Sequence, residues 1–247
     1  MDGWLIFDPP NRGDWNMSVD ETLMSWAAET GRAILRFYQW SEPTLSLGYF
    51  QSAVDRNRHP ASLSCSWVRR STGGGAILHD HELTYSVAFP TADRSRREAR
   101  WLYDAMHETL VELLGSLGVT AQLCDFERHW PRGEEPFLCF QRRTVGDVLV
   151  AGNKVGGSAQ RRQPGVALQH GSVLLRRSPA APELLGICEL SEASLEAIDV
   201  ARRWSDLAAR RLSLRLEEMA ALPTVVRDRA ETVLRDKFGV ASWNEKR

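Results

Sequence analysis

The order of patterns along the chain predicts an α+β fold with a mixed, mostly antiparallel β-sheet flanked by α-helices. Short runs rich in β-branched and aromatic residues dominate the chain up to residue 90 and return between residues 145 and 175. Segments with helical periodicity separate these runs, and the pattern after residue 179 is mainly helical. The 247 residues contain no long linker, so a single domain over residues 1–247 is expected.

Composition and charge argue against several classes of protein. A net charge of −1 lacks the basic excess of a nucleic-acid-binding protein. The first residues, Met1-Asp2-Gly3-Trp4, lack the basic start of a signal peptide, and no apolar run approaches the roughly 18 residues of a membrane span. We therefore expect a cytoplasmic protein that binds neither nucleic acid nor membrane. Metal and disulfide sites are not expected either, because no C-x-x-C spacing joins the four cysteines, Cys65, Cys124, Cys139 and Cys188.

The first predicted elements are a strand, a helix and two further strands. Residues 4–7 are apolar and are followed by Pro9-Pro10, which is typical of a strand that ends there. The helix is predicted from apolar residues at every fourth position, Trp15, Val19, Leu23 and Ala27, and Gly31 is expected to end it. Strands are then expected at residues 33–40 and 44–47.

Three successive glycines, Gly73, Gly74 and Gly75, lie between strand-like runs at residues 66–68 and 83–89. Glycine permits positive φ and lacks the Cβ that keeps a ligand from the backbone, so the run indicates either a tight hairpin or a binding loop. The flanking Arg69-Arg70 and His79 favour the binding loop. It is not a phosphate-binding P-loop, since no Lys-Ser or Lys-Thr pair follows. We expect its N–H groups to face an acyl or carbonyl group.

A long helix and a polar loop follow. The helix is predicted over residues 94–117 from one apolar face, formed by Leu102, Met106, Leu110, Leu113 and Leu117. Gly118 ends it, and a short strand is expected at residues 119–121. The polar, turn-rich residues 125–136 predict a mobile loop.

The second half of the chain begins with a hairpin. Strands at residues 145–151 and 154–160 flank Gly152-Asn153, a pair that favours a two-residue turn. Another strand is expected at residues 166–175, and a last helix at residues 224–238. Lys154 would then begin the second strand of the hairpin.

Lysine is scarce, because arginine supplies 28 of the 31 basic residues. A lysine kept in mid-chain, Lys154, indicates a need for a compact ammonium that a guanidinium cannot replace. The other two, Lys237 and Lys246, are expected to be ordinary surface lysines.

Cys139 precedes Lys154 by fifteen residues, and we expect both on or beside adjacent strands that lead to the glycine loop. A nearby ammonium favours the thiolate, the reactive form of cysteine. Cys139 also has the apolar neighbours of a small core residue. The residues alone leave both interpretations open, and they equally leave open whether His79 or His170 acts as a base.

Two motifs in this order resemble those of the biotin/lipoate protein ligase and octanoyltransferase superfamily. The first is Arg69-Arg70-x-Thr72-Gly73-Gly74-Gly75-Ala76-x-x-His79; the second is Gly152-Asn153-Lys154-Val155-Gly156-Gly157-Ser158-Ala159, followed by Gln169-His170-Gly171-Ser172. The chain is most similar to the cysteine-type octanoyltransferases, which carry a cysteine at the place of Cys139. The resemblance implies the same α+β catalytic-domain architecture.

The resemblance also implies roles for residues. Cys139 would accept the acyl group, and Lys154 would direct its ammonium to the acyl carbonyl. The small residues 157–159 would form a slim wall of an acyl tunnel. The substrate-binding residues would be Arg70, Thr72, Gly73, Gly74, Gly75, Ala76, His79, Gly157, Ser158, Ala159, His170 and Gly171. Apart from the resemblance, the arginine-rich patches could receive an acidic carrier protein or a phosphate, and Arg161 and Arg162 are the better candidates. For the first patch, ordinary solvated arginines are at least an equal alternative. The patches are Arg94, Arg96, Arg97 and Arg100, and Arg142, Arg143, Arg161 and Arg162.

The function implied is octanoyl transfer, without a cofactor, from octanoyl-acyl carrier protein to a lipoyl-domain protein such as glycine cleavage H protein. One alternative is a lipoate-protein ligase, which needs ATP and Mg²⁺; residues 145–148 partly resemble such ligases. A second is an amidotransferase that moves an octanoyl or lipoyl group between lipoyl domains. A third is a catalytically silent lipoyl-domain binder, which the presence of Cys139, Lys154 and the glycines argues against.

Overall fold

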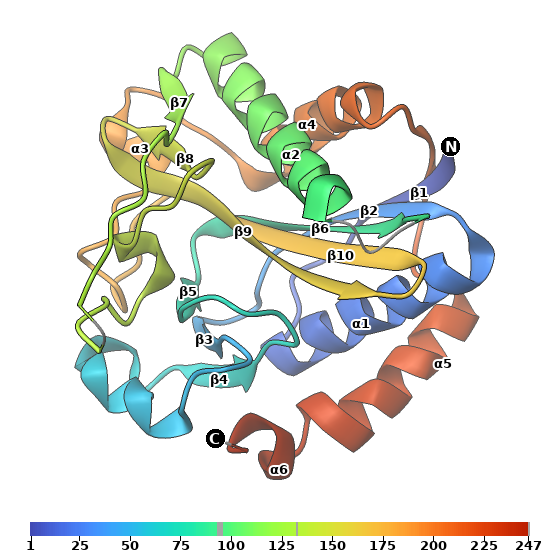
Figure 1. Cartoon of the computed structure of the whole chain (residues 1–247), viewed down its shortest axis with the longest axis horizontal. Coiled ribbons are helices and arrows are strands. Elements are labelled where there is room, and N and C mark those ends of the chain that lie inside the picture. Colours follow the sequence, from blue (N-terminus) through green and yellow to red (C-terminus); the bar gives the residue numbers. More distant parts are fainter. Residues whose placement is uncertain (93–95, 132, 247) are drawn as a thin grey trace.

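The computed structural model describes residues 1–92, 96–131 and 133–246. Its larger sheet has eight strands in the order β11-β1-β2-β6-β10-β9-β8-β7 (Figure 1). In chain order these strands are β1 (Asp2–Phe7), β2 (Ala33–Tyr38), β6 (Glu82–Pro90), β7 (Ala121–Leu123), β8 (Val148–Val150), β9 (Asn153–Gln163), β10 (Val166–Leu174) and β11 (Arg215–Met219). β1 pairs in parallel with β11 and β2, and every other neighbouring pair is antiparallel. The predicted mixed, mostly antiparallel sheet is confirmed.

A second, three-stranded sheet holds the glycine loop. Its order is β4-β3-β5, with strands Ser66–Arg69, Thr44–Leu47 and Ile77–His79. The glycine loop, Gly73, Gly74 and Gly75, joins β4 to β5 at the edges of this sheet. The sequence predicted the strands at residues 44–47 and 66–68 but not that they leave the larger sheet, since pairing between distant segments leaves no local pattern.

Helices cover both faces of the larger sheet (Figure 1). α2 (Arg96–Ser116) and α4 (Ala197–Arg211) enclose one apolar core, and α1 (Gly13–Thr30) and α5 (Thr224–Val233) enclose the other. Short helices α3 and α6 are Ile187–Leu190 and Ala241–Asn244. Arg94, where the predicted long helix began, lies outside the described residues. No helix in residues 1–92, 96–131 and 133–246 is long and apolar enough to cross a membrane.

Several elements differ from the sequence prediction, and β8 is shorter than predicted, because it begins at Val148 rather than at residue 145. β7 begins at Ala121 rather than at residue 119. The hairpin turn is formed by Ala151 and Gly152, both with positive φ, because Val150 pairs with Asn153. The mainly helical last third contains β11, whose exposed, half-polar residues give no apolar run but pair with β1. The hairpin turn was placed one residue too late and β11 was missed for the same reason. The strand that a segment pairs with, rather than its local sequence preference, determines both.

A β-bulge between β8 and β9 changes which way the side chains of β9 point. Val148 pairs with Gly156 and Leu149 with Lys154, so Val155 is an extra residue. Val155 lies in the core under α2, and a Cβ on Gly156 would lie 3.1 Å from Leu110 of that helix. Lys154 and Gly157 therefore share the opposite side, and they lie next to each other.

Candidate active site

Arg70 shapes the glycine loop from within. Its buried guanidinium donates to the carbonyl oxygen of Ser46 (2.7 Å) and to those of Gly73 (3.1 Å) and Gly75 (2.9 Å). Gly74 has φ of +91°, a conformation that favours glycine. With these carbonyls turned toward Arg70, the N–H groups of the three glycines have no acceptor within the described parts of the chain. Burial lowers the pKa of Arg70 to about 10, so it remains a cation at neutral pH.

Cys139 lies directly against this loop. The Cys139 N–H donates to the Ala76 carbonyl (2.7 Å), and the Ala76 N–H donates to the Phe137 carbonyl (3.2 Å). Cys139 begins a 3-10 turn, Cys139–Gln141, rather than lying in a strand. A Cβ on Gly75 would lie 3.3 Å from the Cys139 Cα, so the close contact depends on a glycine there. The segment 137–139 thus brings the predicted nucleophile to the loop, as the sequence analysis expected.

Lys154 approaches Cys139 from β9. Its Nζ lies 3.9 Å from the Cys139 Sγ and 2.8 Å from the Asp147 Oδ2, and the side chain is buried. Burial alone would lower the pKa of Lys154, but the nearby Cys139 and Asp147 outweigh it and raise the pKa above its ordinary value. Lys154 is therefore an ammonium at neutral pH.

Two further cations lie near Cys139. Burial lowers the pKa of Arg70, and the charge of Cys139 partly opposes that shift, which indicates that the two groups are close. Arg142 places its Cζ 3.1 Å from the position of a Cβ on Gly75, and its Nε donates to the Pro136 carbonyl (2.8 Å). Together with Lys154, these guanidinium groups place three positive charges around the glycine loop and the turn that begins at Cys139. The sequence pattern offers Arg142 as a contact for a carrier protein or a phosphate and does not predict its place beside the glycine loop.

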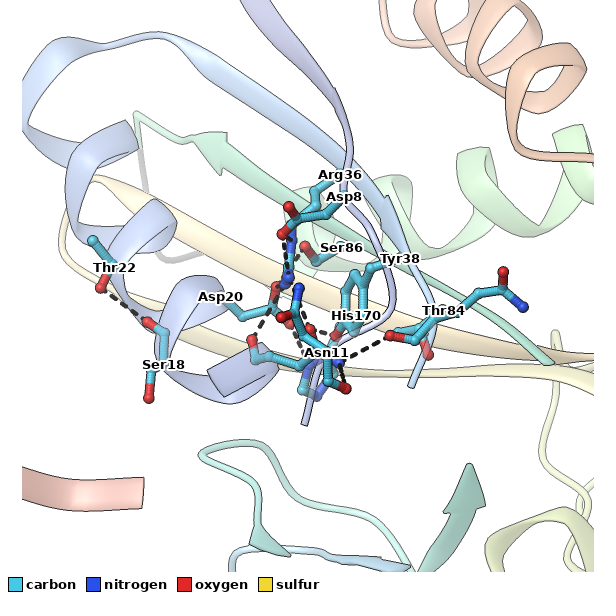
Figure 2. A network of polar contacts seen from close by, with 12 residues as sticks. Asp8, Asn11, Ser18, Asp20, Thr22, Arg36, Tyr38, Thr84, Ser86 and His170 are labelled. Carbon is cyan, nitrogen blue, oxygen red and sulfur yellow. Dashed lines mark hydrogen bonds and ion pairs between the residues drawn. The ribbon is translucent and has the colours of Figure 1, made fainter. Parts of the chain in front are cut away.

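His170 is fixed between Thr72 and Asp20. Its Nε2 lies 2.6 Å from the Thr72 Oγ1, and its Nδ1 lies 3.2 Å from the Asp20 Oδ2. Figure 2 shows Asp20 in the network that also contains Arg36 and Tyr38. Burial acts to raise the pKa of Asp20, but the bond to His170 and the charge of Arg36 lower it. Asp20 is thus an anion, and it accepts a hydrogen bond from the Nδ1–H of His170.

His79 has both nitrogens occupied by neighbours. Its Nε2 lies 2.7 Å from the Ser46 Oγ, its Nδ1 lies 2.9 Å from the Glu82 Oε1, and its ring stacks on Trp40. Burial lowers the pKa of His79, against the opposing effect of Glu82. His79 and His170 line the same crevice, which has a volume of about 10 Å³. That volume holds about one water molecule, so this crevice is too small for an eight-carbon chain in this structure.

The predicted wall of small residues on β9 is not continuous. A Cβ on Gly157 would lie 2.5 Å from the Lys154 Cε, so the space beside Gly157 holds the lysine stem. Ser158 points to the α2 side, where its Oγ contacts Tyr85 and His107. Ala159 pairs with His170 and shares its face. Neighbouring residues of a strand face opposite sides, so an acyl group can meet Ala159 and His170 together but not Ser158.

The C-terminal segment, residues 234–246, holds the strand that leads into the glycine loop. Asn244 accepts from the Arg69 N–H through its Oδ1 (2.9 Å), and the Trp243 Nε1 donates to the Arg69 carbonyl (2.9 Å). Lys237 contacts Ser71 and Glu21, and the Lys246 Nζ lies over the Trp243 ring. The expectation of two ordinary surface lysines is wrong, because tertiary contacts gather all three lysines around this loop.

Asp147 also lies at this site, although the sequence did not single it out. Its carboxylate accepts from the Thr144 N–H (2.8 Å), from the Thr144 hydroxyl (3.1 Å) and from the Tyr103 hydroxyl (3.1 Å), besides pairing with Lys154. The only sequence signal was an aspartate seven residues before Lys154, within the segment that partly resembles ligases.

Comparison with known proteins agrees with this arrangement. The model of the lipoyl protein ligase A/B catalytic domain matches residues 13–184. The chain belongs to this family. Both predicted motifs fall within the matched residues, and the earlier resemblance is confirmed at the level of the superfamily.

Relatives in this family include proteins named octanoyltransferase LipM. The one from Bacillus subtilis is 36% identical over 184 residues, which cover 70% of this chain and 65% of that protein. The one from Lysinibacillus sphaericus is 38% identical over 175 residues, covering 65% of this chain and 61% of that protein. The one from Kyrpidia tusciae is 39% identical and covers 73% and 69%. The match thus spans roughly two thirds of these relatives.

Solved structures in the family share the fold. A putative lipoate protein ligase from Thermoplasma acidophilum with bound lipoic acid has a TM-score of 0.79 at 20% identity, covering 99% of this chain and all of that chain. Lipoate-protein ligase A bound with ATP has a TM-score of 0.74 at 20% identity, covering 99% of both chains. At this identity the likeness establishes the catalytic-domain fold, which was the predicted architecture.

Proposed function

We propose that this protein transfers an octanoyl group from octanoyl-acyl carrier protein to a lysine of a lipoyl-domain protein, with Cys139 as the acyl carrier. The observation that supports this most directly is the 3.9 Å approach of the Lys154 ammonium to the Cys139 thiol, beside the open N–H groups of the glycine loop. The names of the relatives, octanoyltransferase, point to the same group transfer.

In the first step the Cys139 thiolate attacks the carbonyl carbon of the donor thioester. The bond from that carbon to the donor sulfur breaks, and the carrier leaves as a thiol after taking up a proton. Negative charge develops on the carbonyl oxygen, and the Lys154 ammonium and the glycine-loop N–H groups are the donors that stabilise it. One such donor typically contributes about 3 kcal/mol.

In the second step the neutral amine of the acceptor lysine attacks the Cys139 thioester. The new amide bond forms as the bond from carbon to the Cys139 sulfur breaks. One of the two amine protons stays on the amide nitrogen, and the other is released and balances the charge of the Cys139 thiolate. One thioester replaces another in the first step, and an amide replaces a thioester in the second. The sequence of steps therefore needs no nucleotide.

The octanoyl chain is proposed to enter the crevice between the glycine loop and the larger sheet. Arg70, His79, His170 and Gly171 line this crevice. Its present volume of about 10 Å³ requires that it widens when the chain enters. Burial of about seven CH₂ groups at roughly 0.8 kcal/mol each would yield on the order of 5 kcal/mol, which is ample for a measurable preference in chain length.

The acceptor is proposed to be a lipoyl-domain protein. One structural neighbour, a bi-partite lipoate protein ligase from Thermoplasma acidophilum, is described with its E2 lipoyl domain. Glycine cleavage H protein is an acceptor of this kind. The proposed donor, acyl carrier protein, has a thioester of the type that the Cys139 geometry suits.

One incubation separates the proposal from its alternatives. The protein is mixed with octanoyl-acyl carrier protein and an apo lipoyl domain, with and without ATP and Mg²⁺, and the mass of the lipoyl domain is measured. Octanoylation without ATP supports the transferase. Modification only with free octanoate or lipoate and ATP identifies a ligase instead. Transfer only from an octanoylated lipoyl domain identifies an amidotransferase, and no modification at all fits a silent binder.

A further inference from the structure

Asp147 is a buried carboxylate that the reaction steps above do not use. Its side chain is about 2% exposed, and its Oδ2 lies 2.8 Å from the Lys154 Nζ. Burying an ionised carboxylate is costly unless the group is paired and hydrogen-bonded. For Asp147 the fold meets that cost directly behind the lysine that approaches Cys139. We therefore expect the Asp147 carboxylate to have a role at this site.

The carboxylate of Asp147 is itself held rigidly. Thr144 binds it through both N–H and hydroxyl, and Tyr103 on α2 binds the other oxygen through its hydroxyl. The backbone of the same residue is tied to Cys124 next to β7, because the Cys124 N–H donates to the Asp147 carbonyl (2.7 Å). Contacts from three segments thus fix the position of the Asp147 carboxylate that pairs with Lys154.

The stem of Lys154 also has a fixed path. The bulge at Val155 places Lys154 and Gly157 on the same side of β9, and the Lys154 Cε fills the space that a Cβ on Gly157 would need. From there the ammonium reaches Asp147 at 2.8 Å and Cys139 at 3.9 Å. A flexible side chain is thereby restricted to one position between a carboxylate and a thiol.

We propose that Asp147 is a positioning residue: it holds Lys154 beside Cys139 as a permanently protonated cation, so that Lys154 stabilises charge and does not serve as the base. This inference rests on the proposed function and assigns a role within it. Electrostatics support this role as well as geometry, because an ammonium paired with a buried carboxylate has little tendency to release its proton. Deprotonation of Cys139 must then use another acceptor, such as solvent.

The other groups that face Lys154 are consistent with this role. Cys139 and Arg142 approach from the turn that begins at Cys139, and His107 approaches from α2. Burial lowers the pKa of His107 to about 4, and its Nδ1 donates to the Gly146 carbonyl, so His107 is neutral. Arg142 opposes the charge on Lys154. Among the described residues, Asp147 is the one carboxylate in contact with the Lys154 ammonium.

The test uses the scarcity of lysine in this chain. Protein labelled with ¹³C at the lysine Cε gives signals from three residues, Lys154, Lys237 and Lys246, and loss of one signal in Lys154→Arg assigns it. In Asp147→Asn the Lys154 titration should move to lower pH by about one unit or more, while the other two signals stay. Octanoyl transfer should lose about 10- to 100-fold in kcat, and its alkaline limb should shift with the titration.

The matched control is Asp104→Asn, which removes a half-buried aspartate of α2 that pairs with Arg100. It should change neither the titration nor kcat. A Lys154 signal that titrates at the wild-type pH in a folded Asp147→Asn protein overturns the proposal. Should that variant unfold, Tyr103→Phe removes one hydrogen bond to Asp147 and should shift the titration in the same direction by less; no shift there also overturns it. The Lys154 titration needs no substrate, so its result does not depend on whether the protein transfers octanoyl groups as proposed.

Discussion

The Lys154 Nζ lies 3.9 Å from the Cys139 Sγ, although the two residues are fifteen positions apart and belong to different elements. This pairing makes the acyl-enzyme directly testable. With octanoyl-acyl carrier protein and no acceptor, wild-type protein should gain one octanoyl group on Cys139, and hydroxylamine should remove it. Cys139→Ser should fold and gain none, because a serine hydroxyl has no accessible anionic form at neutral pH. Intact mass and peptide mapping provide the readout.

The control for this variant is Cys188→Ser, which changes a partly buried thiol packed against the core under α2. It should accept the octanoyl group as the wild type does. Full transfer activity in Cys139→Ser would remove the thioester from the mechanism, and an accompanying requirement for ATP would identify a ligase.

Lys154→Arg should keep the fold and lose most octanoyl transfer. The guanidinium keeps the positive charge but is planar and larger, and it cannot occupy the site between Asp147 and Cys139 that the ammonium fills. The measurement is the rate of lipoyl-domain octanoylation beside a thermal melt. Lys237→Arg, at an ion pair with Glu21, is the matched control and should retain most activity. A fully active Lys154→Arg variant would show that Lys154 has no specific role.

Gly157→Ala should reduce kcat by about 100-fold while leaving stability nearly unchanged. The new Cβ would lie 2.5 Å from the Lys154 Cε, so the flexible end of the lysine must move. Such a shift costs little folding free energy, but a displacement near 1 Å can cost about 10²-fold in rate. Kinetics and thermal melts measured on the same preparation separate the two effects.

The same substitution at Gly115 provides the comparison. No heavy atom lies within 4 Å of a Cβ there, and the residue is in α2. Gly115→Ala should stabilise the protein by roughly 0.5 to 1 kcal/mol and leave kcat unchanged. Equal activity of the two variants would contradict the claim that Gly157 makes room for Lys154.

Asp20→Asn should destabilise the protein in a pH-dependent way. The pKa of Asp20 is lower in the folded state than its ordinary value of 3.8, so ionised Asp20 contributes its full stability above that pH. The contribution is lost as the pH falls through the lowered folded-state pKa. Unfolding free energies should differ by about 3 kcal/mol at pH 7, because the buried Arg36 loses a partner.

Denaturant unfolding of wild type and Asp20→Asn at pH 7 and at pH 3 checks this. The difference between them should be smaller at pH 3. A difference that is constant with pH would show that the ionised form of Asp20 does not matter for stability.

Local patterns predicted the long helices, most strands and the glycine loop, because periodicity and glycine conformation are properties of neighbouring residues. They could not predict Asp147 as the partner of Lys154, since that pairing depends on the bulge at Val155 and on a turn held by Tyr103. The same limit explains the missed small sheet and the missed β11. It also explains Lys237 and Lys246, whose surroundings come from α1, β4 and the C-terminal segment.

The pairing of β1 with β11 also has a consequence for how the chain is made. Arg215 of β11 lies beside Asp2 of β1, 213 residues earlier in the sequence. During synthesis the outer edge of β1 therefore stays without its strand partner until β11 has left the ribosome. An unpaired strand edge invites pairing with other chains. Newly made protein is thus most exposed to aggregation late in translation, and shortening the chain before residue 219 would make that exposure permanent.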